Sequence, residues 1–299
     1  MKILITGSHG LVGSALVSFL TTEGYLIQRL VRSNTHEETG DILWSPELKQ
    51  VDPAKLEGFD AVIHLAGENI ASGRWTEEQK QKIRDSRVIG TRFLSETLAS
   101  LKSPPKVFIS ASAIGYYGAR NDEVVAEESA PGSGFLADVC REWEEATGSA
   151  VKNNIRVVNA RFGIILSAAG GALKKMLLPF RLGVGGKLGS GRQIMSWIAL
   201  DDVVAGLYHV LNATNLRGPV NFVSPQSLTN WEFTKALGTV LKRPTIFPVP
   251  AFVIKTLFGE MGETLLLNGV NVAPKKLLES GYTFHFPELK EALHHLLGK

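Results

Sequence analysis

The feature that most constrains this chain is a glycine-rich turn between its first apolar strand pattern and its first helical pattern. Residues 6–13 read TGSHGLVG and directly follow the apolar run KILI. Gly7 permits a tight turn, Gly10 lets a ligand approach the backbone, and Gly13 allows the helix to pack closely on the strand. The free N–H groups at the start of such a helix bind phosphates. The pattern therefore predicts a βαβ unit with a dinucleotide site at its first turn.

Every residue of this turn is expected to lie at the cofactor. These residues are Thr6, Gly7, Ser8, His9, Gly10, Leu11, Val12 and Gly13. The His9 side chain is expected to point to solvent. The alternative interpretation is a glycine turn with a purely structural role.

The end of the second strand pattern indicates which dinucleotide binds. An NAD site usually presents an acidic side chain to the ribose about 20 residues after the turn. Residues 28–33 read QRLVRS and contain no carboxylate. Arg32 and Ser33 are therefore expected to hold a 2′-phosphate, since a guanidinium and a hydroxyl suit that group. The pattern favours NADP(H), and the alternative is that Arg32 is only a surface arginine at a strand end.

Hydrophobic periodicity predicts an α/β fold with a Rossmann-type, doubly wound parallel sheet. Strand patterns near 2–6, 25–32, 60–66, 106–112 and 155–166 alternate with helical patterns. One helix should begin after Trp75 with a capping box of Thr76 and Gln79. A second should run from Leu136 to Ala150 on an apolar stripe.

The later part of the chain changes character. Residues 1–166 are expected to form the Rossmann lobe, with its sheet completed by about 196–225. Residues 167–195 and 226–299 are expected to form a smaller C-terminal substrate lobe. Residues 183–191 hold five glycines and should be a flexible loop.

Composition excludes several classes of protein. Lys and Arg number 32 against 29 Asp and Glu, without a long run of one sign, so no nucleic-acid partner is expected. The single Cys140 excludes an intramolecular disulfide, and no Cys/His spacing suits a metal. No apolar run approaches the ~20 residues that cross a bilayer, and no signal peptide is visible. A protein of the cytoplasm, or of an organelle matrix if it is processed, is expected, with a small-molecule substrate and possible homodimer formation.

The chain resembles the extended and atypical short-chain dehydrogenases/reductases, and more narrowly their epimerase-family branch with a C-terminal domain of unknown function. Besides the glycine turn, the motifs that carry this resemblance are HLAGENIA at 64–71, RWTEEQK at 74–80, SASAIGYYG at 110–118, KMLLPFRLGVGG at 175–186, GSGRQIMSWIALDDV at 189–203 and APKKLLESGY at 273–282. The resemblance implies a Rossmann lobe that binds NADP and a C-terminal lobe that closes over the substrate. It implies further cofactor contacts at the ends of later strands, from Leu65, Ala66, Gly67, Ser110, Ala111, Arg161 and Gly163.

The resemblance to the parent superfamily breaks down at its catalytic dyad. Ser112 matches the superfamily's catalytic Ser/Thr, which bonds to a substrate oxygen. Where the superfamily has Tyr-x-x-x-Lys, residues 135–140 read FLADVC, and that motif occurs nowhere in the chain. Tyr116, Tyr117 and Glu68 are the remaining candidates for a proton donor in the cleft. For each of them a packing or capping role is the alternative.

Three features of the C-terminal half bear on the substrate. Asp201 and Asp202 open a helix and are expected to cap it. Lys187 and Arg192 flank the glycine loop, where they either meet an anionic substrate or are simply solvated. Met195 stands where nucleotide-sugar enzymes of this superfamily often carry an arginine for the diphosphate.

The leading hypothesis is an NADP(H)-dependent oxidoreductase that acts on an unidentified small substrate. A nucleotide-sugar epimerase or dehydratase is the second hypothesis, although it lacks the Tyr, the Lys and the diphosphate arginine. A non-catalytic NADP-binding regulator or scaffold is the third, because the chain keeps the cofactor turn and loses the dyad. Fold alone does not choose among these functions.

Overall fold

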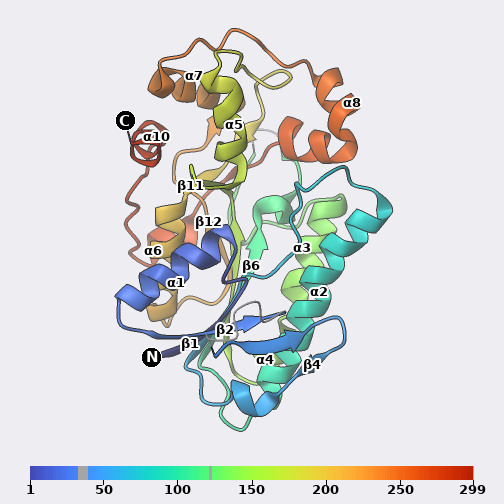
Figure 1. Cartoon of the computed structure of the whole chain (residues 1–299), viewed down its shortest axis with the longest axis vertical. Coiled ribbons are helices and arrows are strands. Elements are labelled where there is room, and N and C mark those ends of the chain that lie inside the picture. The colour runs from blue at the N-terminus through green and yellow to red at the C-terminus, as the bar shows by residue number, and fades with distance from the viewer. Residues whose placement is uncertain (33–39, 121–122, 299) are drawn as a thin grey trace.

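An eight-stranded sheet forms the centre of the protein in the computed structural model, which describes residues 1–32, 40–120 and 123–298 (Figure 1). From one edge to the other, the strands are β12 (Gly218–Phe222), β8 (Arg156–Phe162), β6 (Val107–Ala113), β5 (Ala61–His64), β1 (Lys2–Thr6), β2 (Leu26–Val31), β3 (Ile42–Ser45) and β4 (Gln50–Val51). Every neighbouring pair is parallel except β3 with β4. The chain moves from β1 to β3 in one direction and resumes at β5 on the other side of β1. This reversal is the switch point of a doubly wound Rossmann sheet.

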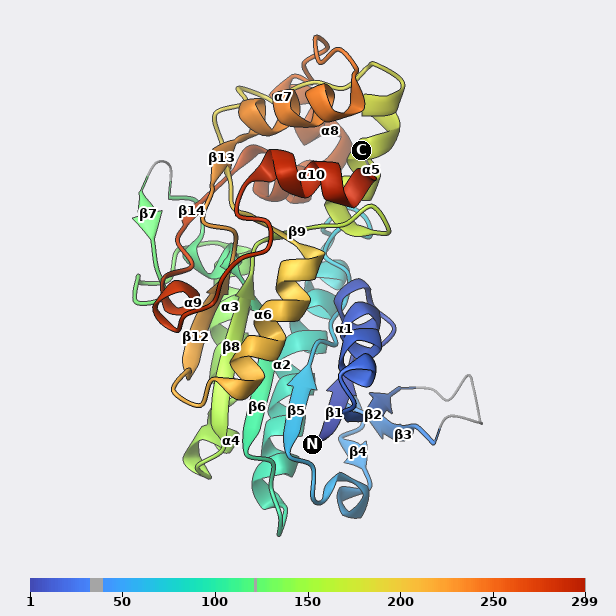
Figure 2. The ribbon, with the colours of Figure 1, turned by 90° about the vertical axis from the view of Figure 1, so that its left-hand side faces the viewer.

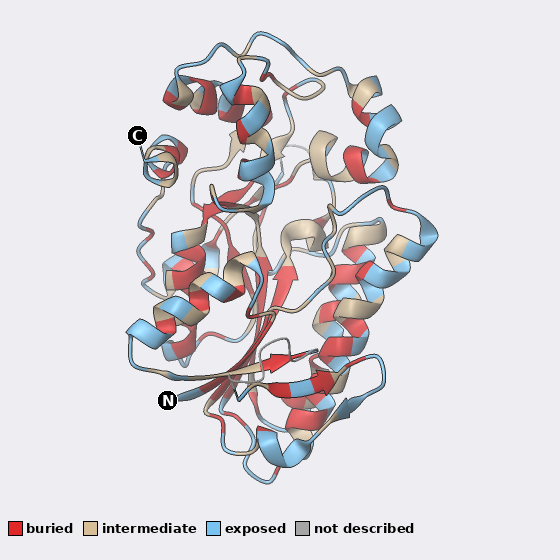
Figure 3. Ribbon diagram, viewed as in Figure 1, coloured by how far each residue is buried: buried red, intermediate tan, exposed pale blue. Residues whose placement is uncertain are grey.

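Helices cover both faces of the sheet (Figure 2). On one face lie α1 (Leu11–Thr22) and α6 (Leu200–Asn212), and on the other lie α2 (Glu77–Ser100), α3 (Phe135–Glu145) and α4 (Gly148–Lys152). Side chains alternate between the two layers: Ile3 and Ile5 join the core beneath α1, and Leu4 joins the core beneath α2. This two-sided burial explains why the strands are apolar almost throughout (Figure 3).

The remaining elements lie mostly beyond the carboxyl ends of the parallel strands (Figures 1 and 2). The helices are α5 (Gly171–Arg181), α7 (Asn230–Leu241), α8 (Ala251–Gly262), α9 (Lys275–Glu279) and α10 (Leu289–Leu297). The short strands are β7 (Val124–Val125), β9 (Ile164–Leu166), β10 (Ile194–Met195), β11 (Trp197–Ala199), β13 (Leu228–Thr229) and β14 (Asn271–Val272), and the short turns of helix are η2 (Pro53–Leu56), η3 (Ile114–Tyr117) and η4 (Glu263–Leu267). A third core, which includes Leu177, Trp197 and Phe233, joins α5, β11 and α7.

Two elements expected to be continuous are interrupted. The helix expected from Leu136 to Ala150 is divided into α3 and α4. The strand expected at 155–166 ends at Phe162, and β9 then leaves the main sheet to pair with β11. Gly163 lies at this junction, where an added Cβ would be 2.7 Å from the Ser196 carbonyl oxygen. Close packing at the junction therefore requires glycine there.

One further local expectation, the complete capping box, was wrong, and the flexibility of the glycine-rich loop stays a prediction. The capping box at the start of α2 is only half formed: Thr76 Oγ1 accepts the Gln79 N–H, but the Gln79 amide donates to Ser72 Oγ. The loop at 183–191 is tied to its surroundings by backbone hydrogen bonds, since Gly189 N–H donates to the Val249 carbonyl and Val249 N–H to the Lys187 carbonyl. The division into a Rossmann lobe and a smaller substrate lobe at the stated boundaries stays a prediction.

Candidate nucleotide-binding and active site

The glycine turn packs directly on the end of β5. Gly7 has φ +67°, and an added Cβ there would lie 2.7 Å from the Leu65 carbonyl carbon. An added Cβ at Gly13 would lie 2.1 Å from the Gly7 carbonyl oxygen. Such distances exclude any side chain at either position. Gly7 and Gly13 therefore bring β1, α1 and β5 together at the switch point of the sheet.

A buried polar cluster fixes the same junction. Thr6 Oγ1 accepts the N–H groups of Leu65 and Ala66 at 3.1 and 3.2 Å. It also lies 2.6 Å from Nδ1 of His64, whose Nε2 is 3.0 Å from Thr91 Oγ1. Burial lowers the pKa of His64 to about 4, so the ring is neutral at physiological pH. Thr6 and His64 thus join the turn to β5 and α2 without a charge.

The outer side of the turn is open. Gly10 is exposed and precedes α1, and no side chain of the described residues caps the free N–H groups of that helix. Ser8 is 4% exposed, and its Oγ is without a hydrogen-bond partner among the described residues. His9 is exposed, as expected. This bare helix end and unpartnered hydroxyl fit the phosphates of a dinucleotide.

The end of β2 places Arg32 at the surface. Its side chain is 68% exposed, and Nη1 lies 3.8 Å from Glu47 Oε1. An ion pair this exposed contributes little to stability, so the guanidinium can turn to another anion at small cost. Ser33 lies outside the described residues.

A cation that the sequence analysis missed lies at the end of β5. The Arg87 guanidinium stacks over the Trp143 ring at 5.1 Å and donates to the Ile83 carbonyl at 3.0 Å. An added Cβ at Gly67 would lie 3.4 Å from its Cζ. In the described part of the chain Arg87 forms no ion pair, and burial lowers its pKa. The sequence held a signal for this residue. Arg87 lies one turn after Ile83 and one turn before Thr91, which places it on the buried face of α2.

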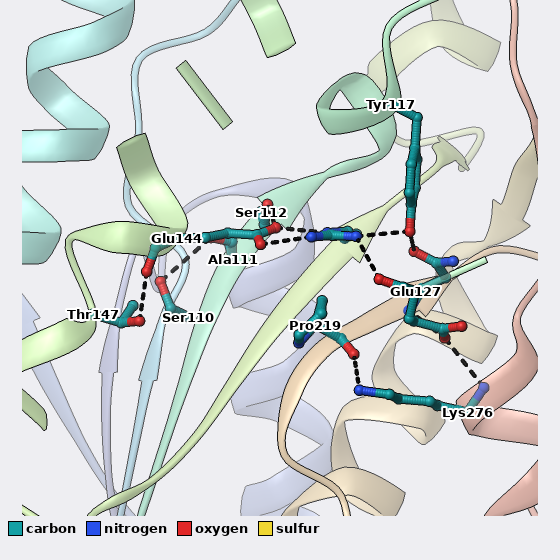
Figure 4. Close-up of polar contacts among 11 residues, drawn as sticks. Ser110, Ala111, Ser112, Tyr117, Glu127, Glu144, Thr147, Pro219 and Lys276 are labelled. Carbon is teal, nitrogen blue, oxygen red and sulfur yellow. Dashed lines mark hydrogen bonds and ion pairs between the residues drawn. The ribbon is translucent and has the colours of Figure 1, made fainter. Parts of the chain in front are cut away.

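Ser112 belongs to a buried ionic network (Figure 4). Its hydroxyl donates to Glu144 Oε1 at 2.7 Å. Both oxygens of Glu144 accept from Arg161, from Nε and Nη2, each at 2.7 Å. The Arg161 side chain is 2% exposed, and the charge of Glu144 raises its pKa despite burial. Arg161 was expected to contact the cofactor, but its fork is occupied by Glu144.

The network continues through the tyrosines of η3. Arg161 Nη1 donates to the Tyr117 hydroxyl at 2.8 Å, and that hydroxyl donates to Asn221 Oδ1 at 2.7 Å. Tyr117 is fully buried, and burial raises its pKa to about 12. The Tyr116 ring covers the Arg161 guanidinium at 3.5 Å and is only half-buried. The two adjacent tyrosines therefore differ in access: Tyr117 is internal, and Tyr116 reaches the surface.

Glu144 is the second residue that sequence reasoning missed. The signal was available in the sequence VVNARFGII, where Arg161 is the one charged residue in a largely apolar stretch. A buried arginine needs hydrogen-bond acceptors around its guanidinium, and a carboxylate is the acceptor that also balances its charge. Which carboxylate supplies it depends on the packing of α3 against β8, so sequence alone did not identify Glu144.

The segment that replaces the superfamily's dyad is packed into the protein. The Phe135 ring lies edge-on to Trp75, with centroids 5.2 Å apart. Val139 and Cys140 are buried, and burial raises the pKa of the Cys140 thiol to about 12. Asp138, the other titratable residue of the segment, is exposed and pairs with Arg141 at 3.0 Å. The segment therefore offers neither a tyrosine nor a lysine, and its thiol is buried.

The other residues that the sequence predicted to lie at the site are found near the turn and along the central strands. Glu68 is half-buried at the end of β5, and its backbone N–H donates to Ser86 Oγ; the turn that follows is capped instead by Asn69 Oδ1. Leu11 packs on the loop before α5, where an added Cβ at Gly170 would lie 3.1 Å from its Cδ1. The remaining predicted contacts lie in α1, in the loop after β5, within β6 and after β8, and they are Val12, Leu65, Ala66, Gly67, Ser110, Ala111 and Gly163.

Three residues of the C-terminal half have hydrogen-bond partners within the protein. Asp202 does not cap α6: it is fully buried, accepts the Tyr282 hydroxyl at 2.8 Å and accepts the His285 and Phe286 N–H groups. Met195 Sδ lies 3.5 Å from the Asn230 amide. Lys187 Nζ donates to the Ser190 carbonyl in its own loop.

Within the described residues, no group of His, Cys, Asp and Glu could hold a metal ion. No helix in this part of the chain is long and apolar enough to span a membrane.

The fold and the turn define a Rossmann protein of the short-chain dehydrogenase/reductase type. The chain belongs to the NAD dependent epimerase/dehydratase family, whose family model matches residues 3–222. A second model, a domain of unknown function named DUF1731, matches residues 249–296. The resemblance inferred from sequence is thereby confirmed.

Relatives match along nearly the whole chain. The epimerase family protein MT2273 of Mycobacterium tuberculosis is 43% identical over 291 residues, which is 97% of this chain and 96% of the relative. Human epimerase family protein SDR39U1 has a crystal structure with NADPH, and that structure superposes with a TM-score of 0.91 at 34% identity, covering 100% of both chains. UDP-N-acetylglucosamine 4-epimerase from Bacillus cereus, with a TM-score of 0.78 at 16% identity over 99% of this chain and 98% of its own, shares the fold.

Proposed function

We propose that this protein binds NADP(H) at the glycine turn and is an oxidoreductase-like protein acting on a small molecule. The observation that carries the proposal is the cradle at α1, where Gly7 and Gly13 allow close packing while the helix N–H groups stay uncapped. The absence of a carboxylate from residues 28–33 favours the phosphorylated cofactor. The human relative was solved with NADPH, which supports the same assignment.

Arg87 is proposed to bind the cofactor's diphosphate. Its guanidinium lies beside Gly67, in the loop that follows β5, and the start of that loop packs against the glycine turn. It already stacks on Trp143 and has no carboxylate partner among the described ion pairs. A guanidinium in this state gains strongly from a phosphate because the two form charge-assisted, bidentate hydrogen bonds.

Calorimetric titration tests the cofactor assignment. NADPH should bind at least about tenfold tighter than NADH, since only NADPH carries the 2′-phosphate. Arg87→Gln should weaken both cofactors by about tenfold or more, because both carry the diphosphate. Arg92→Gln, an exposed arginine of the same helix, is the matched control and should leave both affinities unchanged. Equal affinities for the two cofactors would contradict the preference for NADP(H).

For the reaction, we propose a carbonyl reduction in which the bound cofactor supplies the hydride to carbon and a protein group supplies the proton to oxygen. The candidate donors are Ser112, Tyr116, Tyr117 and Glu68. The Ser112 hydroxyl already donates a hydrogen bond to Glu144, and the Tyr117 hydroxyl donates one to Asn221. Tyr116 and Glu68 make no side-chain hydrogen bond in the described chain, which favours them.

Single substitutions test the donor: Ser112→Ala, Tyr116→Phe, Tyr117→Phe and Glu68→Gln, each with NADPH affinity checked. Turnover is followed as NADPH consumption against carbonyl, quinone and enone compounds. Loss of turnover in Tyr116→Phe or Glu68→Gln, with NADPH affinity intact, assigns the donor. Loss only in Ser112→Ala or Tyr117→Phe would contradict the proposed order.

A non-catalytic NADP-binding role is the second candidate function. The specific observation in its favour is the packing of Phe135, Val139 and Cys140 where the dyad would stand. The same assays separate the two functions. NADPH that binds tightly but is consumed with none of the compounds would favour the regulator or scaffold.

A further inference from the structure

An exposed apolar patch lies at one end of the molecule's long axis, at the top of Figure 1, where the loop after α5 meets the loop between α7 and α8. Four large apolar side chains of these two loops are each more than half exposed, and they are Leu182, Val184, Ile246 and Phe247. We call them the apolar tip. Proteins in water seldom gather exposed apolar side chains on one surface unless that surface binds something. The apolar tip is therefore a candidate docking surface.

Backbone contacts hold the two loops of the tip side by side. Val249 N–H donates to the Lys187 carbonyl, and Gly189 N–H donates to the Val249 carbonyl. Gly186 lies so close to the next loop that an added Cβ would meet the Phe247 carbonyl oxygen. The apolar side chains of both loops therefore belong to one surface.

The same part of the chain is strongly cationic. Residues 171–193 and 233–259 contain nine Lys and Arg residues and no Asp or Glu. Among the described residues, Lys255 alone of these cations forms an ion pair, with Glu263. Glu232 lies at the other end of α7, where it accepts the N–H and hydroxyl of Thr229. Within the two segments, no carboxylate balances the cations beside the apolar tip.

A groove of about 460 Å³ carries part of this charge. Lys235, Lys242 and Arg243 line it at the end of α7, together with Ile246 of the apolar tip, and no Asp or Glu lines it. Arg243 Nε donates to the Arg181 carbonyl, and its two Nη groups have no partner among the described residues. A small groove with a purely cationic charge attracts an anionic group, and its volume suits one phosphate-bearing headgroup.

Charge indicates what covers this surface. A second copy of the chain, related by a two-fold axis through the tip, would bring like cations together, and the two segments hold no carboxylate to pair with them. A bound peptide normally adds a strand to a sheet edge or lies in a long apolar groove, whereas the tip consists of two adjoining loops. A bilayer with anionic lipids offers negative headgroups above an apolar layer. That combination matches cations beside protruding apolar side chains.

We propose that the apolar tip docks on a membrane surface that contains anionic phospholipids. Lys235, Lys242 and Arg243 bind headgroup phosphates, while Ile246 and Phe247 enter the boundary between headgroups and acyl chains. The contact is peripheral and requires no membrane-spanning helix. It turns α5 and α8, which lie beyond the carboxyl ends of the central strands, toward the lipid (Figure 1). The inference is independent of NADP(H) binding and of the proposed reaction.

Vesicle sedimentation with the whole chain tests this proposal. The wild-type protein should bind vesicles of phosphatidylcholine with about 30% phosphatidylglycerol at least about tenfold more tightly than vesicles of phosphatidylcholine alone. Raising the salt concentration from about 0.1 M to about 0.5 M should weaken binding to the anionic vesicles, because salt screens the headgroup contacts. Equal binding to both kinds of vesicle would overturn the proposal, as would no binding to either.

Two double variants separate the apolar contact from the charged one. Ile246→Ser with Phe247→Ser should weaken binding to the anionic vesicles by at least about tenfold, because two apolar side chains no longer leave water. Lys235→Gln with Lys242→Gln should weaken it by at least about fivefold at low salt. All four residues are exposed, so circular dichroism should show that both variants are folded.

The controls change similar residues far from the tip. Leu48→Ser replaces an exposed leucine between β3 and β4, and Lys102→Gln with Lys152→Gln replaces two exposed lysines after α2 and at the end of α4. Each control should bind the anionic vesicles within about twofold of wild type. Losses in the controls as large as those in the tip variants would overturn the proposal, because binding would then follow total charge or total apolar surface.

Two further results would assign the surface to another occupant and so overturn the proposal. A wild-type dimer that ignores vesicles, and that Ile246→Ser with Phe247→Ser converts to a monomer in analytical ultracentrifugation, would show that a second copy covers the tip. Calorimetric binding of glycerol 3-phosphate without vesicle binding would show a site for a small free anion only.

Discussion

Two regions at the carboxyl ends of the central strands differ in how they treat their polar groups. At the end of β1, the turn leaves the α1 N–H groups uncapped and Ser8 Oγ unpartnered. At the ends of β6 and β8, Ser112, Glu144 and Arg161 bond to one another. The first region therefore has free N–H and hydroxyl donors that could bond to a ligand. In the second region the polar groups already bond to one another.

The two regions are therefore suited to different roles, the first to binding a ligand and the second to stabilising the fold. Unsatisfied donors at a helix start are stable only because solvent or an anion can reach them. A buried ion pair, in contrast, is stable only while both partners are present. In most short-chain dehydrogenases/reductases the second region would carry the catalytic dyad, as the resemblance implies. Here we infer that it mainly holds β6, β8 and α3 together.

The largest expected effect comes from breaking the ionic network. Glu144→Gln leaves the Arg161 charge buried without a counter-charge, which should lower the free energy of unfolding by about 3–5 kcal/mol. Glu142 lies on the same helix as Glu144 and pairs with Arg84 in a more exposed position. Glu142→Gln should therefore lower the free energy of unfolding by less than about 1 kcal/mol. Urea denaturation measures both. Similar small losses would show that the network does not stabilise the fold.

Filling the close contact in the glycine turn should have the next largest effect. Gly13→Ala places a methyl group against the Gly7 carbonyl oxygen and should destabilise the protein by about 3 kcal/mol. NADPH binding should weaken with it. Gly148→Ala, where nothing lies within 4 Å of the added Cβ, is the control and should change stability by less than about 0.5 kcal/mol. A tolerated Gly13→Ala would mean that α1 does not pack against the Gly7 carbonyl in this way.

His64 makes the junction beneath the turn sensitive to pH. Its pKa falls from 6.5 in the unfolded chain to about 4 in the fold, so the unfolded state binds more protons between these values. The stability is complete above pH 6.5 and is lost as the pH falls toward 4, by about 2 kcal/mol at pH 5. Denaturation at pH 8 and pH 5 should show this loss in wild-type protein and a smaller one in His64→Asn. An equal loss in both would assign it to other groups.

Nucleotide sugars should have no measurable effect. Met195 packs beside Asn230, and a thioether offers no charge to a diphosphate. In thermal-shift assays with NADPH present, UDP- and dTDP-sugars should leave the melting temperature unchanged. A clear stabilisation would favour the epimerase hypothesis, because a ligand that binds only the native state raises its stability.

The sequence predicted the glycine turn and its place on the first strand better than it predicted the network, for a physical reason. The turn is local: eight consecutive residues specify its glycines, its helix start and its place on the first strand. Two-sided burial of the strands likewise left a pattern that predicted the parallel sheet. The doubly wound fold and the family resemblance were both confirmed.

The network depends on residues distant in the chain. Glu144 lies 17 residues from Arg161, and Asn221 lies 104 residues from Tyr117. No single window of sequence shows these pairs. Arg87 and Arg161 stand out only as charges on apolar faces, a signal that predicts burial but names no partner. The same limit explains the wrong cap at Asp202, whose partners lie 80 or more residues away.

The separation of the two regions is tested most directly by measuring NADPH affinity in Glu144→Gln at low temperature, where circular dichroism shows that the variant is folded. The account predicts a dissociation constant within about threefold of wild type, despite the lower free energy of unfolding. It would be contradicted by a folded Glu144→Gln that binds NADPH about tenfold or more weakly, because the network would then be part of the cofactor site.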